Sequence, residues 1–583
     1  MPRLGYNYTE EEEERRQKEE EHLLIYTPGQ CSSLLTGSLP GVSAGFAMAW
    51  DGFWSSCCLC LQRIYGCNCR KNRRGKLKGT KGTQCECIWV LLLLLVFFFT
   101  LIWMLITLTL GNDMHNFNEE VFRFAGIWLD WSVVFLTVAA VLLTYCGILM
   151  LLSFCLVLCG LPIQLHWCHK VLFLLSAIVI ILLCVGLSLK WREEWQTAYI
   201  YMQATLPFLH IGAVIGVSAL AWVLAGYYWR TKTGVLKYLI LTVYIILLGA
   251  LYPLPVYITS PCVLKSSDLP PKPGLIGHRG APMLAPENTL MSFNKTVASG
   301  IKVFETDVAI SQDGVPFLMH DSKLLRTTNV REIFQEQSQY NSTNFTWANL
   351  QKLDAGSWYL EKDPFKTVSV LTPQDQEEVR RQKIPALQEV LKEAEKNNIS
   401  IIFDLYVPPE DHPYNDSYID ITLETIFNSS IRPELILWLP DEQREEVIAR
   451  APGFRQIFGP LKQENYTLEA VNMPYNLSLE KIRSYRQKNI SVNLYVVNEP
   501  WLFSYVWCAG ATSVTSNACH LLKNIQRPQW VLDPQYYVII WIVVDAISLA
   551  HVIWAFIIQR TCSKRKEYQD AETVLLMKIG NSI

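Results

Sequence analysis

The sequence has almost no net charge. Its 51 lysines and arginines nearly balance its 53 aspartates and glutamates, so the formal charge is only -2. This balance gives no basic footprint of the kind that nucleic-acid-binding domains carry, and we expect no nucleic-acid partner. The N-terminal residues 1–30 are polar and acidic and lack the apolar core of a cleavable signal peptide. We therefore expect the first apolar segment to act as the insertion signal.

Charged residues are also nearly missing from several long segments. Half of all residues are hydrophobic and 18% are charged, which fits a membrane protein that carries a sizeable soluble domain. Crossing a hydrocarbon core takes about 20 apolar residues. We predict six spans, at residues 88–110, 131–158, 171–189, 209–227, 238–258 and 537–558. Polar groups are too sparse within these spans to favour a transporter.

The distribution of lysine and arginine predicts how the spans are oriented. A basic cluster at residues 63–81 precedes the first span, and Arg560, Lys564, Arg565 and Lys566 follow the last one. The positive-inside rule then places both termini in the cytoplasm. The acidic loop 112–130 and the long segment 259–532 are expected outside, so we predict a multi-pass protein of the plasma membrane with an extracellular domain.

Glycosylation sequons support the same orientation. Nine Asn-x-Ser/Thr acceptors fall within the segment predicted to lie outside, which predicts a glycoprotein. They are Asn294, Asn341, Asn344, Asn398, Asn415, Asn428, Asn465, Asn476 and Asn489. Asn7 also matches but is expected to remain bare on the cytoplasmic side.

Cysteines gather in the cytoplasmic region 1–87, where eight of the 17 lie between Cys31 and Cys87. Palmitoylation beside the basic cluster, a zinc site with unusual C-x-C spacing and a redox role all remain open. This region could also recruit cytosolic partners. On the outer side Cys262, Cys508 and Cys519 are an odd number in an oxidising space. We expect one disulfide and one remaining thiol, with the pairing left open.

The segment 259–532 alternates short β-rich runs with helical stretches. Such alternation over about 250 residues predicts an α/β domain, a TIM-type (β/α)₈ barrel. We predict helices at 289–299, 387–397, 441–450, 479–488 and 501–509. Nine strands are predicted, one more than a barrel needs, at 275–277, 303–308, 316–319, 400–405, 435–439, 455–458, 470–472, 491–496 and 513–515. The polar and aromatic stretch 322–383 interrupts the alternation, and we interpret it as an insertion over the barrel mouth.

Acidic residues end two of the predicted strands. Glu305 and Asp307 are two residues apart on one strand, so their side chains point to the same side. Adjacent carboxylates repel each other unless a cation joins them, and oxygen ligands suit Ca²⁺ or Mg²⁺. Asp404 ends a later strand and is the expected third ligand.

Two histidines follow predicted strands of the same domain. His278 and His320 could share the roles of general base and general acid, because imidazoles titrate near neutral pH. Arg279 has the planar guanidinium that matches phosphate oxygens. Together with a cation site, these groups predict metal-assisted cleavage of a phosphodiester.

These motifs occur together and in order along the chain. They are His278-Arg279-Gly280, Pro286-Glu287-Asn288-Thr289, Glu305-Thr306-Asp307-Val308, Asp313-Gly314-Val315-Pro316, His320-Asp321 and Arg326-Thr327-Thr328. Over residues 274–520 the chain resembles the glycerophosphodiester phosphodiesterase family. Its span pattern is similar to the six-span vertebrate ectoenzyme branch, and most similar to a member associated with osteoblast differentiation.

The resemblance implies a divalent cation on Glu305 and Asp307 and acid and base roles for His278 and His320, with His320 alternatively a metal ligand. It implies substrates such as glycerophosphoinositol or glycosylphosphatidylinositol anchors in the membrane. One departure is Asp404-Leu405-Tyr406, where the family typically has Glu-x-Lys. The alternative function is a catalytically weak receptor or scaffold that signals through its cytoplasmic tails. The predicted organisation is 1–87 cytoplasmic, 88–258 five spans, 259–532 barrel, 537–558 sixth span and 559–583 cytoplasmic tail, with the oligomeric state open.

Overall fold

The computed structural model describes residues 83–158, 165–190, 192, 194–230, 235–257, 259–460, 467–529 and 531–580. The acidic N-terminal tail, the cysteine-rich stretch up to residue 82 and the sequon at Asn465 lie outside the described residues, as do the side chains of Cys85 and Cys87. The palmitoylation, zinc and redox interpretations therefore stay predictions.

Five described helices are long and apolar enough to cross a membrane, judged by length and composition. They are α3 (Thr83–Thr109), α5 (Trp131–Leu158), α6 (Trp167–Lys190), α7 (Glu194–Arg230) and α21 (Pro534–Gly580). The predicted span 238–258 corresponds to a shorter apolar helix, α8 (Val235–Leu251), and to the single turn α9 (Leu254–Tyr257). Pro253, which cannot donate a backbone hydrogen bond, lies between them.

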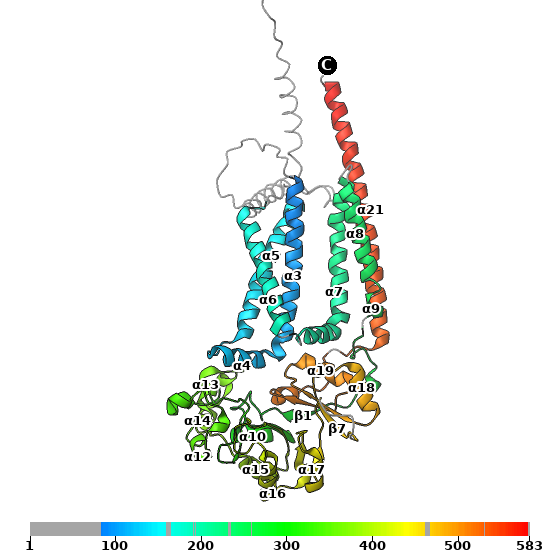
Figure 1. Cartoon of the computed structure of the whole chain (residues 1–583). Helices are drawn as coiled ribbons and strands as arrows, with labels where there is room; N and C mark the ends of the chain where they lie inside the picture. Colours follow the sequence, from blue (N-terminus) through cyan, green and yellow to red (C-terminus); the bar gives the residue numbers. More distant parts are fainter. Residues whose placement is uncertain are drawn as a thin grey trace, which may run out of the picture.

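The apolar helices form two groups (Figure 1). Helix α3 packs against α5 and α6, whereas α7 packs against α8 and α21. Large apolar side chains on these helices are exposed, among them Leu182 and Ile246, each at 64%. A surface of this kind is stable against lipid tails, which are as apolar as the side chains. The chain is thus a multi-span membrane protein by the length and composition of its helices.

The segment predicted as the acidic outer loop 112–130 contains a further helix. Helix α4 (Met114–Ala125) ends at Gly126, whose φ of +68° is the left-handed conformation that glycine adopts readily. It buries Met114, Asn118, Glu119 and Phe122. In Figure 1 α4 lies between the apolar helices and the barrel domain. The loop is therefore a structured connection between the two parts of the molecule.

Eight parallel strands form the barrel in the order β6-β5-β4-β2-β1-β9-β8-β7. They are β1 (Gly274–Gly277), β2 (Val303–Ile310), β4 (Ser400–Leu405), β5 (Ile436–Trp438), β6 (Arg455–Gln456), β7 (Ala470–Pro474), β8 (Ser491–Tyr495) and β9 (Ser513–Ser516). A parallel bridge between Phe458 and Val471 joins the two ends of this order. The predicted TIM-type barrel is confirmed.

The surplus strand is the one predicted at 316–319. Strand β3 (Pro316–Leu318) pairs antiparallel with β2 and lies off the barrel path. Parallel barrel strands need a long crossover connection, whereas only five residues separate β2 from β3, so a hairpin is the available geometry. His320 therefore follows the hairpin strand β3 and not a barrel strand. The predicted insertion also follows β3.

Helices cover the outside of the barrel. They are α10 (Leu290–Ala298), α15 (Leu387–Asn397), α16 (Tyr418–Asn428), α17 (Arg444–Arg450), α18 (Leu479–Gln487) and α19 (Pro500–Ala509). Helix α15 illustrates the packing, since Leu387, Val390, Leu391 and Ala394 recur at helical spacing and are all buried. The sequence pattern predicted all of these helices except α16.

The insertion has its own short helices: α11 (Val330–Ile333), α12 (Trp347–Leu350), α13 (Ser357–Lys362) and α14 (Pro373–Arg380). Its aromatic residues fill two small cores. Phe345 packs with Phe317 of β3, and Trp358 and Tyr359 pack with Met291 of α10. The insertion is therefore a folded part of the domain.

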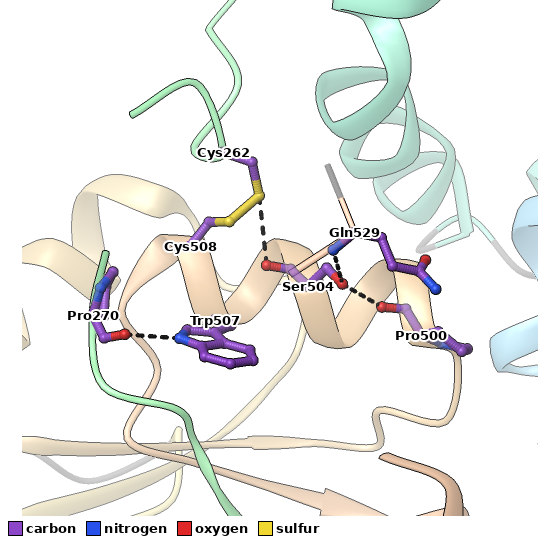
Figure 2. Close-up of a disulfide and its surroundings, with 7 residues drawn as sticks. All are labelled: Cys262, Pro270, Pro500, Ser504, Trp507, Cys508 and Gln529. Carbon is purple, nitrogen blue, oxygen red and sulfur yellow. Dashed lines mark hydrogen bonds between the residues drawn. A yellow bond between two sulfur atoms is a disulfide. The ribbon is translucent and has the colours of Figure 1, made fainter. Parts of the chain in front are cut away.

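A disulfide joins Cys262, in the segment that enters the barrel domain, to Cys508 of α19 (Figure 2). Nearby, the indole Nε1 of Trp507 donates to the carbonyl oxygen of Pro270 at 2.8 Å. Cys519 is a buried free thiol. The expected single disulfide is thus present, and its pairing is resolved.

Candidate active site

The end of β1 carries His278. Its imidazole Nδ1 donates to Oδ1 of Asn517 at 2.6 Å, which leaves Nε2 with the lone pair, 4.0 Å from Oε2 of Glu305. Burial lowers the pKa of His278 to about 4, the charge of Arg279 adds to this effect, and the Asn517 hydrogen bond opposes it. The imidazole is therefore neutral near pH 7, with a ring nitrogen available to accept a proton.

The backbone after His278 turns sharply. Arg279 has φ +50°, an uncommon conformation for a residue with a side chain. Gly280 follows at φ +94°, and a Cβ atom there would overlap Ser292. The strained turn points the Arg279 amide at Oε2 of Glu305, to which it donates at 2.8 Å. The glycine of the His-Arg-Gly motif is thus required by the shape of this turn.

Three carboxylates lie on the neighbouring strands β2 and β4. Asp307 and Asp404 are direct partners in the strand register, and Glu305 is two residues before Asp307. Asp307 is buried and its two oxygens accept hydrogen bonds from Asn288 Nδ2 at 2.8 Å and from the Tyr406 hydroxyl at 2.9 Å. The resembled family has lysine at the position of Tyr406. In this chain the Tyr406 hydroxyl therefore takes that place and donates a hydrogen bond to Asp307.

The electrostatics of these carboxylates fit a cation. Burial, followed by repulsion from Asp307, raises the pKa of Glu305 well above its ordinary value. Desolvation, followed by repulsion from Asp307, raises the pKa of Asp404 to about 6, although part of this side chain is exposed to solvent. Raised values mean that the negative charges are poorly compensated by the protein itself, which a divalent cation would relieve. The donor set, three carboxylates, suits Ca²⁺ or Mg²⁺.

Among the described residues, two sets of side chains have ligand atoms within 4.8 Å of one another: His115, Glu119 and Glu287, and Glu119, His320 and Asp321. The site therefore contains acidic and imidazole groups that could bind a metal. The predicted ligands Glu305, Asp307 and Asp404 do not form such a set. Glu119 belongs to both sets, and Arg279 and Arg326 already bind its carboxylate at 3.0 and 3.1 Å. Two guanidinium groups at this point compensate the negative charge of Glu119, which reduces its attraction for a cation. The assignment of the cation to Glu305, Asp307 and Asp404 stays a prediction.

His320 is oriented by its neighbour. Its Nδ1 and Oδ1 of Asp321 are 2.8 Å apart, so Nε2 is the nitrogen left for chemistry. Burial would raise the pKa of Asp321, but Arg326 outweighs burial and lowers it, so the carboxylate stays charged. The hydrogen bond to Asp321 therefore fixes the ring so that Nε2 is the nitrogen from which a proton could be transferred.

Arg326 organises the acidic side of the site. It is 1% exposed and binds Asp321 through Nε and Nη2, at 2.7 and 3.0 Å. It also binds Glu287 through Nη1 and Nη2, at 2.9 and 2.6 Å. Arg279 Nη1 donates to the same Glu287 at 3.0 Å. Bidentate pairs of this kind fix geometry as well as charge.

Residues 278–427 match the model of the glycerophosphoryl diester phosphodiesterase family. The chain is 48% identical over 532 residues to the glycerophosphoinositol inositolphosphodiesterase GDPD2 of Mus musculus, covering 91% of this chain and 97% of that one. The human protein of the same name is 46% identical with the same coverage. Glycerophosphodiester phosphodiesterase domain-containing protein 5 of Gallus gallus is 42% identical over 86% of this chain and 84% of its own.

The chain belongs to the glycerophosphoryl diester phosphodiesterase family. The structure brings together the residues that the sequence singled out, since His278, Arg279, Glu305 and Asp307 are linked by the contacts above and Asp404 is paired in register with Asp307. His320 joins the group through Asp321 and Arg326. Their roles in this family member stay proposals.

Several residues at the site were not predicted. Four of them lie within the motifs that resemble the family, but the sequence did not indicate what they do: Glu287, Asn288, Asp321 and Arg326. Asn517 and Tyr406 were missed because an amide or hydroxyl at a strand end is common. Glu119 had no local signal at all, because it lies 160 residues before its partner Arg279.

Proposed function

We propose that this chain is a metal-dependent phosphodiesterase of the outer cell surface that hydrolyses glycerophosphodiesters, glycerophosphoinositol among them. The observation that carries the proposal is the pair His278 and His320 at one mouth of the barrel. Each has Nδ1 bound to an oxygen, from Asn517 and Asp321 respectively, and Nε2 left for proton transfer. The name of the mouse relative supports glycerophosphoinositol as the substrate class.

The two histidines divide the proton transfers. His278 is neutral and accepts a proton at Nε2 from the attacking hydroxyl group as its oxygen bonds to phosphorus. His320 donates a proton from Nε2 to the alcohol oxygen as the bond from phosphorus to that oxygen breaks. The protons therefore balance over one turnover once the histidines exchange theirs with solvent. Water or a hydroxyl of inositol can be the attacking group in this scheme.

Glu305, Asp307 and Asp404 are the residues that would hold the cation. A bound Ca²⁺ or Mg²⁺ would neutralise charge on the phosphate oxygens as the bond order changes. The chain itself keeps Asp307 in place through Asn288 and Tyr406. Arg279 supplies a fixed positive charge beside the carboxylates, since its Nε lies 3.5 Å from Oδ2 of Asp307.

A glycosylphosphatidylinositol anchor is a second substrate candidate. The site lies against α4, because Glu119 of this helix contacts Arg279, and in Figure 1 α4 lies between the apolar helices and the barrel domain. This position supports a mouth that opens toward the membrane. A substrate whose glycerol is embedded in the outer leaflet would present its phosphodiester at this level. The same pair of histidines would serve this reaction.

The test compares wild type with His278→Ala, both as full-length purified protein. Each is freed of metal, supplied with Ca²⁺ or Mg²⁺, and given glycerophosphoinositol or a reporter carrying a glycosylphosphatidylinositol anchor. We expect wild type to release product only with a cation and His278→Ala to lose at least about 100-fold, the contribution of a general base. His520→Ala is the matched control, because this half-buried histidine lies outside the site.

Equal product from wild type and His278→Ala would refute the catalytic role of His278. No product from any variant would favour the receptor or scaffold alternative. Product without added cation, after metal removal, would refute the cation site. The two substrates separate hydrolysis of the soluble diester from cleavage of the anchor.

A further inference from the structure

Helix α4, in the connection between the first two apolar helices, inserts a carboxylate into the barrel's site. The Glu119 side chain is only 3% exposed. Its Oε1 accepts hydrogen bonds or ion pairs from Arg279 Nη1 at 3.0 Å, Arg326 Nη1 at 3.1 Å and His115 Nε2 at 2.8 Å. Its Oε2 lies 3.9 Å from Nδ1 of His320. Glu119 thus contacts both arginines of the site and approaches one of its histidines.

A second connection reaches the other histidine. Asn112, at the end of the first apolar segment, is buried, and its Oδ1 accepts from the backbone amide of Asn498 at 2.7 Å. Oδ1 of Asn498 accepts from the amide of Asn517 at 2.9 Å. Asn517 in turn holds Nδ1 of His278. The same connection between membrane helices therefore supports His278 and His320 from two independent directions.

The insertion of the barrel holds α4 from its other side. The ring of Phe365 stacks on His115 with centroids 4.1 Å apart, and Lys362 lies over the ring of Phe122 at 4.7 Å. Lys366 pairs with Asp130, beyond the end of α4, at 3.0 Å. These contacts place α4 between the insertion and the mouth of the barrel. Its position is therefore determined by packing on two faces.

The charge arrangement indicates what Glu119 does. Without it, Arg279 and Arg326 would lie side by side with only Glu287 shared between them. Their mutual repulsion would be compensated less, and the Arg279 side chain would lose one of its two Nη1 acceptors. A guanidinium is useful to a phosphate only when it is held in one orientation. Glu119 supplies part of that restraint.

We propose that Glu119 is a positioning residue of the active site, so that the connection between the first two membrane helices completes the catalytic site of the extracellular barrel. The inference rests on the proposed function and extends it. The barrel by itself would lack both the Glu119 contacts and the Asn112 contacts. The membrane region is then part of the catalytic unit in addition to being its anchor.

Glu119→Gln in the full-length protein tests the assignment, because it keeps the shape of the side chain and removes its charge. We expect kcat for glycerophosphoinositol to fall about 10- to 100-fold, the usual effect of losing a residue that orients a directly acting group. KM should stay equal or decrease, because removal of a negative charge does not weaken binding of an anionic substrate. Glu119→Asp should restore a substantial part of kcat.

Glu120→Gln is the matched control. This neighbour is exposed, and within the described part of the chain its carboxylate pairs with Arg123 alone, so kcat and KM of the variant should equal those of wild type. A merely structural role predicts a different pattern for Glu119→Gln, with KM raised and the midpoint of thermal unfolding lowered. Unchanged or increased kcat, or a decrease accompanied by a raised KM, would overturn the assignment.

Asn112→Ala provides a second route if Glu119→Gln does not fold. This variant removes no charge and breaks the connection to Asn498, so kcat should again fall while KM is maintained. If kcat of Asn112→Ala equalled that of wild type, the proposal that the connection between the membrane helices completes the site would be overturned. Turnover by wild type separately tests the proposed function, so failure of that function is distinguishable from failure of the Glu119 assignment.

Discussion

Asn517 determines which nitrogen of His278 carries the proton and also affects its pKa. Because burial lowers that pKa to about 4, a general base at His278 stays neutral until the pH falls to this region. In Asn517→Asp a carboxylate would face Nδ1 and stabilise the imidazolium, which raises the pKa. We expect the acidic limb of kcat/KM to move to higher pH in this variant, measured between pH 4 and 8 at saturating cation.

The matched control is Asn524→Asp, the same change at an exposed position seven residues later in the chain. Its acidic limb should coincide with that of wild type. A limb that does not move in Asn517→Asp, or that moves to lower pH, would show that His278 is not the group whose protonation limits activity.

At the residue scale, the sequence predicted the groups to which we assign proton transfer and cation binding, and it missed the groups that hold them in place. His278, His320, Glu305 and Asp307 were recognisable because their chemistry is specific and their motifs are short. Asn517 and Glu119 act through position, which depends on how distant segments pack. Glu119 lies in a predicted loop whose acidity was interpreted only as a sign of its location outside the membrane.

At the scale of elements, the alternation of strands and helices predicted the barrel but could not say which of nine strands was surplus. The short connection between β2 and β3 contained the answer, because a parallel neighbour needs a longer crossover. Helix α4 was not predicted, since twelve residues of mixed polarity between two apolar segments are also compatible with an open loop. The face of α4 that is buried is determined by its contacts with the barrel domain, which the sequence of this segment does not record.

The disulfide between Cys262 and Cys508 joins the entry segment of the barrel domain to α19 across 246 residues of sequence. A crosslink across so long a loop restricts the unfolded chain strongly. We expect Cys508→Ser to reduce the free energy of unfolding by about 2–5 kcal/mol. The measurement is thermal unfolding of the purified full-length protein with and without reductant.

Reductant should lower the unfolding midpoint of wild type by more than that of Cys508→Ser, which has already lost the disulfide to Cys262. Cys519→Ser is the control, because Cys519 is a buried free thiol and this variant retains the disulfide. Its midpoint should still respond to reductant. If the midpoint of Cys508→Ser fell as far with reductant as that of wild type, the bond between Cys262 and Cys508 would not be the disulfide that stabilises the domain.

For the molecule as a whole, the apolar helices and the barrel are joined by α4 at the site and by the disulfide-linked segment beside α19. The sequence predicted both parts separately, from apolar segments and from strand alternation. It could not predict that they meet at the active site, because no periodicity records a contact between distant segments. Because α4 contacts the site, a change in the position of the barrel relative to the membrane helices would also change the site.

The sequons give a direct test of that orientation. Of the eight acceptors that the structure describes, five are exposed in the barrel domain and suit a glycan: Asn294, Asn344, Asn398, Asn428 and Asn489. If the barrel is extracellular, enzymatic removal of N-glycans should reduce the apparent mass of the protein made in mammalian cells, and each Asn→Gln change at these positions should remove one step. Asn415→Gln is the control expected to cause no change, because that side chain is half-buried and its Nδ2 donates to the carbonyl oxygens of Pro408 and Pro409. A protein whose mass does not respond to glycan removal would place the barrel on the cytoplasmic side, where α4 and Glu119 would complete a site that faces intracellular diesters.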